Sequence, residues 1–384
     1  MKKKISRRDF LLIILSLGIG AIIPSLFYFT KEKEKRIVLT TYIKTLIEKP
    51  TTIISTITKP ITYTITQDIT KTKTETITKT ETKTITITTT PYIAHLSIVR
   101  KENIYEMVRR AIELVGGLKN LNPGKNVLIK PNVNSNDPCP ATTNPEVIRS
   151  IIKIVKEYEP KRIIVADCSN RNYRPTIESM KNVGIYQAAI QEGAEVIGLE
   201  DMGWENIKPE KAINWPYGIE TTSILKQIDY LISVPVIKTH YIATYSMAIK
   251  NSVGLISDKS RSLLHSYGEP KFGSMLAEIN LIRPPDFIIL DGTKAFVTGG
   301  PFTGEVKQPN IIIATSDIIA ADAIGLAILK YLGTTKNIEE KSIWEQQQIK
   351  RAIEIGLGIS NVNQIIIHDE NINEISQIKE FLFE

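Results

Sequence analysis

The stretch LISVPVIKTH, residues 231–240, begins as an apolar run and ends in Lys238 and His240. Five other short apolar runs end in polar side chains at Lys130, at Asp167, at Glu200 with Asp201, at Asp291 and at Asp317. Helical-looking segments separate most of these runs, which predicts an α/β fold with a doubly wound, mainly parallel sheet and helices on both faces. Ligands of such sheets bind beyond the carboxyl ends of the strands, so we expect the polar residues to line one crevice.

Several segments between the runs have recognisable boundaries. Asn144-Pro145-Glu146 places an N-cap residue before a proline and predicts a helix that runs to Tyr158. Asp317 is expected to cap a helix that ends at Leu332. Residues 201–220 contain two tryptophans and two prolines and predict an excursion over one end of the sheet. The glycine-rich and proline-rich residues 292–307 predict a loop.

Candidate catalytic residues are concentrated after the run at 231–236. His240 and His265 can act as acid, base or metal ligand near neutral pH, and Lys238 lies close to His240 in the sequence. The alternative is a surface lysine and two histidines with purely structural contacts. That alternative is the better one for any single residue, whereas a cluster at a strand end favours a functional site.

Candidate substrate-binding residues carry positive charge or amide groups. Lysines hold a carboxylate or a phosphate as point charges. We expect this role for Lys130 and Lys250, with Asn132 and Asn251 as their neighbours in the site. Asparagine is also common in turns, so a structural role is the alternative for the two amides.

The carboxylates and cysteines leave alternatives open. Asp291 and Asp322 are candidate ligands for a divalent metal. The alternative for Asp291 is that the glycines after it serve only a backbone turn, and the alternative for Asp322 is a solvent-facing acid. Cys139 and Cys168 follow two strands that would be neighbours in a regular sheet, so a disulfide and two free thiols are equally consistent with the sequence. Two cysteines cannot supply the four thiolates of an iron–sulfur cluster, and no such cofactor is expected.

Residues 1–30 carry a targeting pattern. Five lysines and arginines precede an uncharged apolar run at residues 10–29, and the stretch from Ser6 to Leu11 resembles a twin-arginine translocation signal peptide. The run is long enough to cross a membrane as one helix. It predicts a single transmembrane helix in the cell membrane, with the rest of the chain extracytoplasmic. An ordinary signal anchor is the alternative.

Residues 31–91 are expected to form an extended or disordered stalk, because 22 of the 51 residues from Thr40 to Thr90 are threonine. Residues 1–30 have a net charge of +4 and residues 31–91 one of +5. The chain carries +7 in total, so residues 92–384 carry −2. The basic charge therefore belongs to the part beside the membrane, and nucleic acid is not an expected partner of the α/β domain at 92–384.

Residues from about 126 to 333 resemble the family named domain of unknown function 362. The matching motifs are Val127–Asn132, Thr143-Asn144-Pro145, Val234–His240, Ala248–Gly254, His265, Gly299-Gly300-Pro301-x-x-Gly304 and Ser316–Ala323. The resemblance implies a shared site more than a particular activity. Some relatives carry a ferredoxin-like cluster module, whose cysteines are missing here.

These features together favour a membrane-tethered extracytoplasmic enzyme that acts on a small anionic ligand, with metal assistance as an option. The alternatives are a solute-binding or receptor module for an anionic ligand and a structural protein of the cell surface. A binding module needs the lysines, but it has little use for an acid–base pair. The sequence leaves the substrate, the metal and the oligomeric state open.

Overall fold

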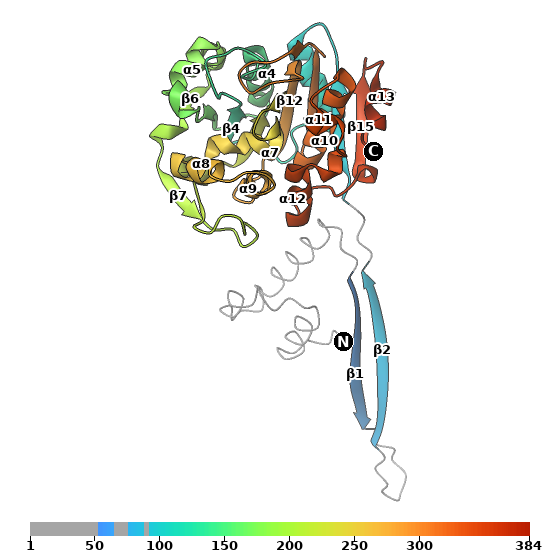
Figure 1. Ribbon diagram of the computed structural model, residues 1–384. Coiled ribbons are helices and arrows are strands. Elements are labelled where there is room, and N and C mark those ends of the chain that lie inside the picture. The colour runs from blue at the N-terminus through green and yellow to red at the C-terminus, as the bar shows by residue number, and fades with distance from the viewer. Residues whose placement is uncertain (1–52, 65–75, 88–91) are drawn as a thin grey trace, which may run out of the picture. The chain divides into compact units, whose positions relative to one another are not determined.

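The computed structural model describes residues 53–64, 76–87 and 92–384 (Figure 1). The chain divides into two compact units, Met1–Tyr92 and Ile93–Glu384. The signal helix expected within residues 1–30 lies outside the described residues. In the part of the chain that is described, no helix combines the length and the apolar character needed to cross a membrane.

The threonine-rich region contains two strands, β1 (Ile53–Thr64) and β2 (Thr76–Ile87). They pair antiparallel along their whole length, from Ile53 opposite Ile87 to Thr64 opposite Thr76. The extended backbone expected from β-branched residues is therefore present here as a hairpin. A hairpin of this strand length spans about 40 Å, which is less than the same residues would span as one extended chain.

The second unit is built on a mixed, mostly parallel sheet. Eight strands lie side by side in the order β15 (Ile365–Glu370), β3 (Ala94–Val99), β14 (Ile311–Thr315), β12 (Phe287–Phe296), β9 (Tyr230–Val234), β4 (Asn126–Pro131), β5 (Arg162–Asp167) and β6 (Glu195–Gly198). Beside β12 lie β10 (Val236–His240) and β13 (Val306–Lys307), and β11 (Thr244–Ser246) pairs with β10. Only β14 is antiparallel to its neighbours in the row of eight.

The direction of β14 corrects the expectation of one crevice lined by all six strand ends. Because β14 runs against β12, Thr315 lies opposite Ile288 at the start of β12. Asp317 therefore lies at the other edge of the sheet from Asp291. The run at residues 231–236 is also not a single strand, since Pro235 separates β9 from β10.

Helices pack against both faces of this sheet (Figure 1). On one face, α3 (Ile104–Leu114), α4 (Pro145–Lys156) and α6 (Ile185–Gln191) bury apolar side chains against Val127 and Ile129 of β4. Leu128, which lies between these two residues in β4, belongs to a separate cluster on the opposite face of the sheet. On that face α10 (Ile318–Leu332) packs Gly325 so closely against β12 that a Cβ would lie 3.3 Å from Leu290.

Several predicted boundaries are confirmed. Asn144 caps α4 by accepting a hydrogen bond from the Glu146 N–H at 3.0 Å, and Asp317 caps α10 through the N–H groups of Ile319 and Ala320. The excursion at 201–220 contains the antiparallel pair β7 (Trp204–Ile207) and β8 (Ile219–Thr222). The loop expected from residue 292 begins later, because β12 continues to Phe296. The other helices are α5 (Thr176–Asn182), α7 (Ala248–Asn251), α8 (Asp258–His265), α9 (Lys271–Ile279), α11 (Lys336–Glu339), α12 (Gln347–Ile355) and α13 (Ile375–Glu380).

Candidate functional site

A small polar cavity of about 40 Å³, here called the inner pocket, lies at the carboxyl ends of β4 and β5 and beside β10. Its lining includes four cationic side chains and one carboxylate: Lys130, Lys238, Lys250, Arg261 and Asp167. Asn132 and Asn251 line it as well. The fold thus brings together all four residues that the sequence predicted for substrate binding, and it adds Lys238 to them.

Lys130 and Asp167 form a buried ion pair on neighbouring strands. The Lys130 Nζ lies 2.7 Å from the Asp167 Oδ1, with side-chain exposures of 2% and 4%. The Asp167 carboxylate also accepts hydrogen bonds from the backbone N–H groups of Val133 and Cys168, at 2.7 and 2.8 Å. Burial lowers the pKa of Lys130, and the charge of Asp167 opposes this shift. The pair is therefore held in place by the backbone around it.

Lys238 has two fixed acceptors. Its Nζ donates to the Asn132 Oδ1 at 2.6 Å and to the Ala141 carbonyl at 2.5 Å. Burial and the positive charge of Lys250 lower the pKa of Lys238 to about 7. A neutral amine has two hydrogens and one lone pair, so the two acceptors leave the lone pair of Lys238 free for proton exchange.

Lys250, on α7, is the lysine of this pocket that has no hydrogen-bond or ion-pair partner among the described residues. Burial, followed by the positive charges of Arg261 and Lys130, lowers its pKa to about 8. The α7 backbone is anchored by Asp322, whose carboxylate accepts from the N–H groups of Ala248 and Ile249 at 2.6 and 3.2 Å. The position of Lys250 therefore depends on a carboxylate in α10.

A second cavity of about 250 Å³, here called the outer pocket, shares Asn134, Lys250, Val253 and Arg261 with the inner pocket. His240 and His265 both line the outer pocket, together with Tyr241 and Phe302. The two cavities are therefore adjacent, and Lys250 is one of the four residues that line both. Both predicted histidines line the outer pocket.

The ring of His240 has a defined hydrogen-bonding role. Its Nδ1 accepts from the backbone N–H groups of Ile242 at 3.2 Å and Ala243 at 3.1 Å. Burial and the charges of Lys250 and Lys238 hold the pKa of His240 well below its usual value. A neutral ring that accepts at Nδ1 carries its hydrogen on Nε2, which makes Nε2 a donor.

His265 is the last residue of α8 and lies at the exposed side of the outer pocket. Its ring lies beside Phe272, with ring centroids 5.3 Å apart. Burial and the nearby charges of Lys250 and Arg261 lower the pKa of His265. This shift favours the neutral ring, which has one nitrogen able to accept a proton.

The two candidate metal ligands lie outside both pockets. Asp291 is buried, and its carboxylate accepts from the Asn144 N–H at 2.8 Å and from the N–H and Oγ1 of Thr293 at 2.9 and 2.7 Å. Asp322 caps α7, and burial raises its pKa to about 8. Within residues 53–64, 76–87 and 92–384, no three His, Cys, Asp or Glu side chains are grouped to hold a metal ion. Asp291 and Asp322 thus serve backbone N–H groups.

Cys139 and Cys168 are free thiols, so the disulfide option is not realised. The loop after β4 carries Cys139 across the sheet to β12, where its Sγ lies 3.6 Å from the Thr293 Oγ1. Cys168 follows β5, and β9 and β4 lie between β12 and β5. Three strand spacings amount to about 14 Å, whereas the Cα atoms of a disulfide are less than about 7 Å apart.

Two charged residues of the inner pocket were not among the predicted site residues. Asp167 was recognised at a strand end but not as the partner of Lys130. Arg261 lies on α8, which was not expected, although Ser257 followed by Asp258 is a helix-start signal. The Arg261 guanidinium donates to the carbonyls of Cys168, Ser169 and Ile256 at 2.7, 2.9 and 3.2 Å, so it holds the end of β5 against α8.

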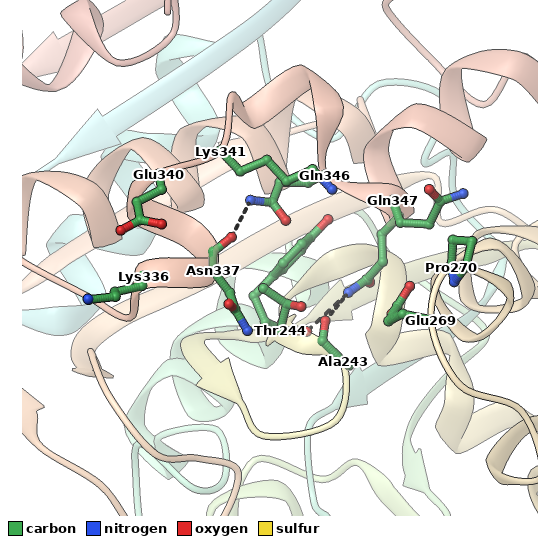
Figure 2. A pocket seen from close by; sticks show the side chains of 12 residues that line it. Ala243, Thr244, Glu269, Pro270, Lys336, Asn337, Glu340, Lys341, Gln346 and Gln347 are labelled. Atoms are coloured by element: carbon green, nitrogen blue, oxygen red, sulfur yellow. Dashed lines mark hydrogen bonds between the residues drawn. The ribbon is translucent and has the colours of Figure 1, made fainter.

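A larger cavity of about 500 Å³ contains none of the predicted site residues (Figure 2). Glu269 and Pro270 lie on one side of it, and Lys336, Asn337 and Glu340 lie on the other (Figure 2). It is separated from the outer pocket by residues 241–244, since Tyr241 and Ile242 line the outer pocket and Ala243 and Thr244 line this cavity.

Comparison with known proteins finds the family described as domain of unknown function (DUF362), which matches residues 127–327. A thylakoid-associated protein of Synechocystis is 27% identical over 229 residues, which cover 58% of this chain and 69% of that protein. Two solved structures are also similar. The lactate racemase apoprotein of Thermoanaerobacterium thermosaccharolyticum has a TM-score of 0.35 at 18% identity and covers 56% of this chain. A protein from Thermotoga maritima has a TM-score of 0.35 at 11% identity and covers 49% of this chain. This chain spans about half of each of those two, 54% and 49% of their lengths.

Proposed function

We infer that this chain, which belongs to the DUF362 family, is an enzyme that binds a small carboxylate or phosphate anion in the inner pocket and acts on it by acid–base chemistry. The observation that carries this proposal is the charge balance of the pocket. Four cationic side chains and a single carboxylate line it. Unpaired buried charge is unfavourable, so an anion bound there would offset the excess positive charge.

Each predicted residue has a distinct role in this proposal. Lys250 and Lys238 contact the anion, because Lys250 has no other hydrogen-bond partner among the described residues and the charged form of Lys238 keeps a third N–H free. Lys130 and Asn251 support the site indirectly. Lys130 forms the ion pair with Asp167, and its Nζ also contacts the Asn251 Oδ1 at 3.4 Å. Asn132 orients Lys238.

The acid–base step would use groups that titrate near neutral pH. Lys238 has a pKa of about 7 and is suited both to accept and to return a proton at that pH. The Nε2–H of His240 would donate to an oxygen on which negative charge develops, because its Nδ1 is engaged by the backbone. His265 at the outer side would exchange protons with solvent.

The second candidate function is a binding module that captures an anionic solute. The same charge balance supports it, and it differs by having no use for the fixed Nε2 donor of His240. The two functions are therefore separated by turnover and not by affinity.

The full chain, purified in detergent, would be titrated by calorimetry with inorganic phosphate and with acetate. We expect binding of at least one anion, at least ten-fold weakened in Lys238→Met and Lys250→Met and unchanged in the exposed Lys161→Met. Absence of binding would contradict both functions. The enzyme is then tested by following C–H exchange of small carboxylates in D₂O by NMR. Binding without exchange of any carboxylate would favour the binding module.

The proposal includes a location outside the cell, with the domain tethered by the helix at residues 10–29. It is supported by the paired Arg7 and Arg8 and by the charge of residues 1–91. Replacing both arginines by lysine should leave the chain on the cytoplasmic side in a protease-protection assay. Unchanged export would show that another route carries the protein.

A further inference from the structure

We propose that Lys250 is a nucleophile that forms an imine with the carbonyl carbon of a 2-oxo acid. This inference rests on the proposed anion site and names its substrate class. The carboxylate of the 2-oxo acid would lie in the inner pocket. Its remaining atoms would extend into the outer pocket.

Lys250 is distinguished from the other cationic groups of the inner pocket by its contacts. Lys130 is bonded to Asp167, and Lys238 donates to two oxygens. Arg261 donates to three carbonyls. In the described part of the chain, Lys250 has no such partner, so its amine can react without breaking a hydrogen bond of the fold.

The state of the amine suits this role. A lysine becomes nucleophilic when burial and neighbouring positive charges favour its neutral form. Both effects act on Lys250, through its own burial and through Arg261 and Lys130, and they lower its pKa to about 8. About half of the amine is therefore neutral at pH 8, whereas an exposed lysine is almost fully charged there.

The position of Lys250 selects the substrate class. The inner pocket, about 40 Å³, has room for a carboxylate-sized group, and the outer pocket, about 250 Å³, has room for a larger one. Lys250 lines both cavities. The carbon that it attacks is therefore next to the carboxylate, which is the arrangement of a 2-oxo acid.

The step is balanced without any further reactant. The lone pair of Lys250 Nζ attacks the carbonyl carbon, and the oxygen takes a proton to give a carbinolamine. Loss of the second hydrogen from nitrogen and departure of the oxygen as water then form the C=N bond. His240 Nε2–H, in the outer pocket, would donate to this oxygen both as it becomes charged and as it leaves.

The test is reductive trapping of the full chain with pyruvate and sodium cyanoborohydride at pH 8, followed by intact mass and peptide mapping. We expect one reduced adduct per chain, located on Lys250. Inorganic phosphate should suppress it by competing for the inner pocket. His240→Asn should slow its formation at least ten-fold.

Lys250→Arg is the matched variant, because arginine keeps the positive charge but cannot form the imine. We expect this variant to form no adduct, while Lys161→Arg traps normally. Pyruvate binding without an adduct on wild-type Lys250 would overturn the inference and leave the anion site standing. An adduct that forms equally on surface lysines would also overturn it. Loss of phosphate binding in the wild type would instead contradict the proposed function.

Discussion

A Cβ on Gly254 would lie 1.8 Å from the Asp167 Oδ1 and 2.6 Å from the Lys130 Nζ. These distances are too short for any side chain, so only glycine fits against the buried ion pair. Glycine is therefore required at position 254 by the packing of the site and not by the conformation of a turn. Gly268 is a contrasting case, because nothing lies within 4 Å of the Cβ that would be added there.

We expect Gly254→Ala to displace the ion pair, to lower the free energy of unfolding by about 1–3 kcal/mol, and to weaken phosphate binding. Urea unfolding and calorimetry measure the two effects. Gly268→Ala is the control, with an expected change within about 0.5 kcal/mol. Equal stability and equal phosphate affinity of the two variants would contradict this prediction. They would show that the residues around Gly254 can move to accommodate a Cβ.

At the scale of elements, the turn between β10 and β11 connects the site to the rest of the fold. His240 Nδ1 holds the N–H groups of Ile242 and Ala243 from one side. From the other side, Gln348 of α12 donates from its Nε2 to the carbonyls of Ala243 and Tyr245 at 2.9 and 3.2 Å. The orientation of His240 is therefore set by the turn that it stabilises.

Substitutions of His240 should separate its two roles. The Asn side chain offers an acceptor near the place of Nδ1 but no donor near Nε2, whereas Ala offers neither. We expect His240→Ala to be less stable than His240→Asn by about 1–2 kcal/mol, because it leaves backbone N–H groups unpaired. Both variants should lose carboxylate turnover. Turnover retained by His240→Asn would contradict the donor role of Nε2.

Some helices and strands could be predicted from the sequence, and others could not. The start of α4 at Asn144-Pro145 and the start of α10 after Asp317 are confirmed, because a helix cap depends on residues next to one another. The direction of β14 was not predictable. Its residues are all buried, and those from Ile311 to Ala314 are apolar. A buried apolar run has the same pattern in a parallel and an antiparallel strand.

At the scale of the whole molecule, charge is unevenly distributed. The chain carries +7, but residues 92–384 carry −2. The inner pocket nevertheless gathers four cationic groups around one carboxylate. Burying these groups makes stability depend on pH. Lys238 has a pKa of about 7 when folded, compared with an ordinary value of 10.5.

The sign of this dependence follows from proton binding. Between about pH 7 and 10.5 the unfolded chain holds the Lys238 proton and the folded chain does not, so raising the pH favours folding. We expect the stability of the wild type relative to Lys238→Met to rise from pH 7 to pH 9, by at most about 1.4 kcal/mol per pH unit. Urea unfolding at pH 7, 8 and 9 measures it. The contributions of other titrating groups, including Asp322, largely cancel when the stability of Lys238→Met is subtracted from that of the wild type.

Lys161→Met is the control for this measurement, because Lys161 is exposed. Its difference from the wild type should stay constant over the same range. A constant difference for Lys238→Met as well would mean that Lys238 keeps an ordinary pKa in the folded chain. The base role proposed for this lysine would then be lost.

The sequence by itself determined the mixed α/β class, the position of Lys130 near the end of a strand, the helix caps and the family. These properties depend on residues that are close together in the sequence, so they can be read from the sequence directly. Lys238, by contrast, lies in the middle of β10. Only the tertiary structure decided that Asp167 pairs with Lys130, that α8 brings Arg261 to the pocket, and that Lys250 is left without a partner in the described part of the chain. It also placed Cys139 over β12, away from Cys168. Contacts of this kind join residues far apart in the chain, and packing and strand order select them after each local pattern has been satisfied.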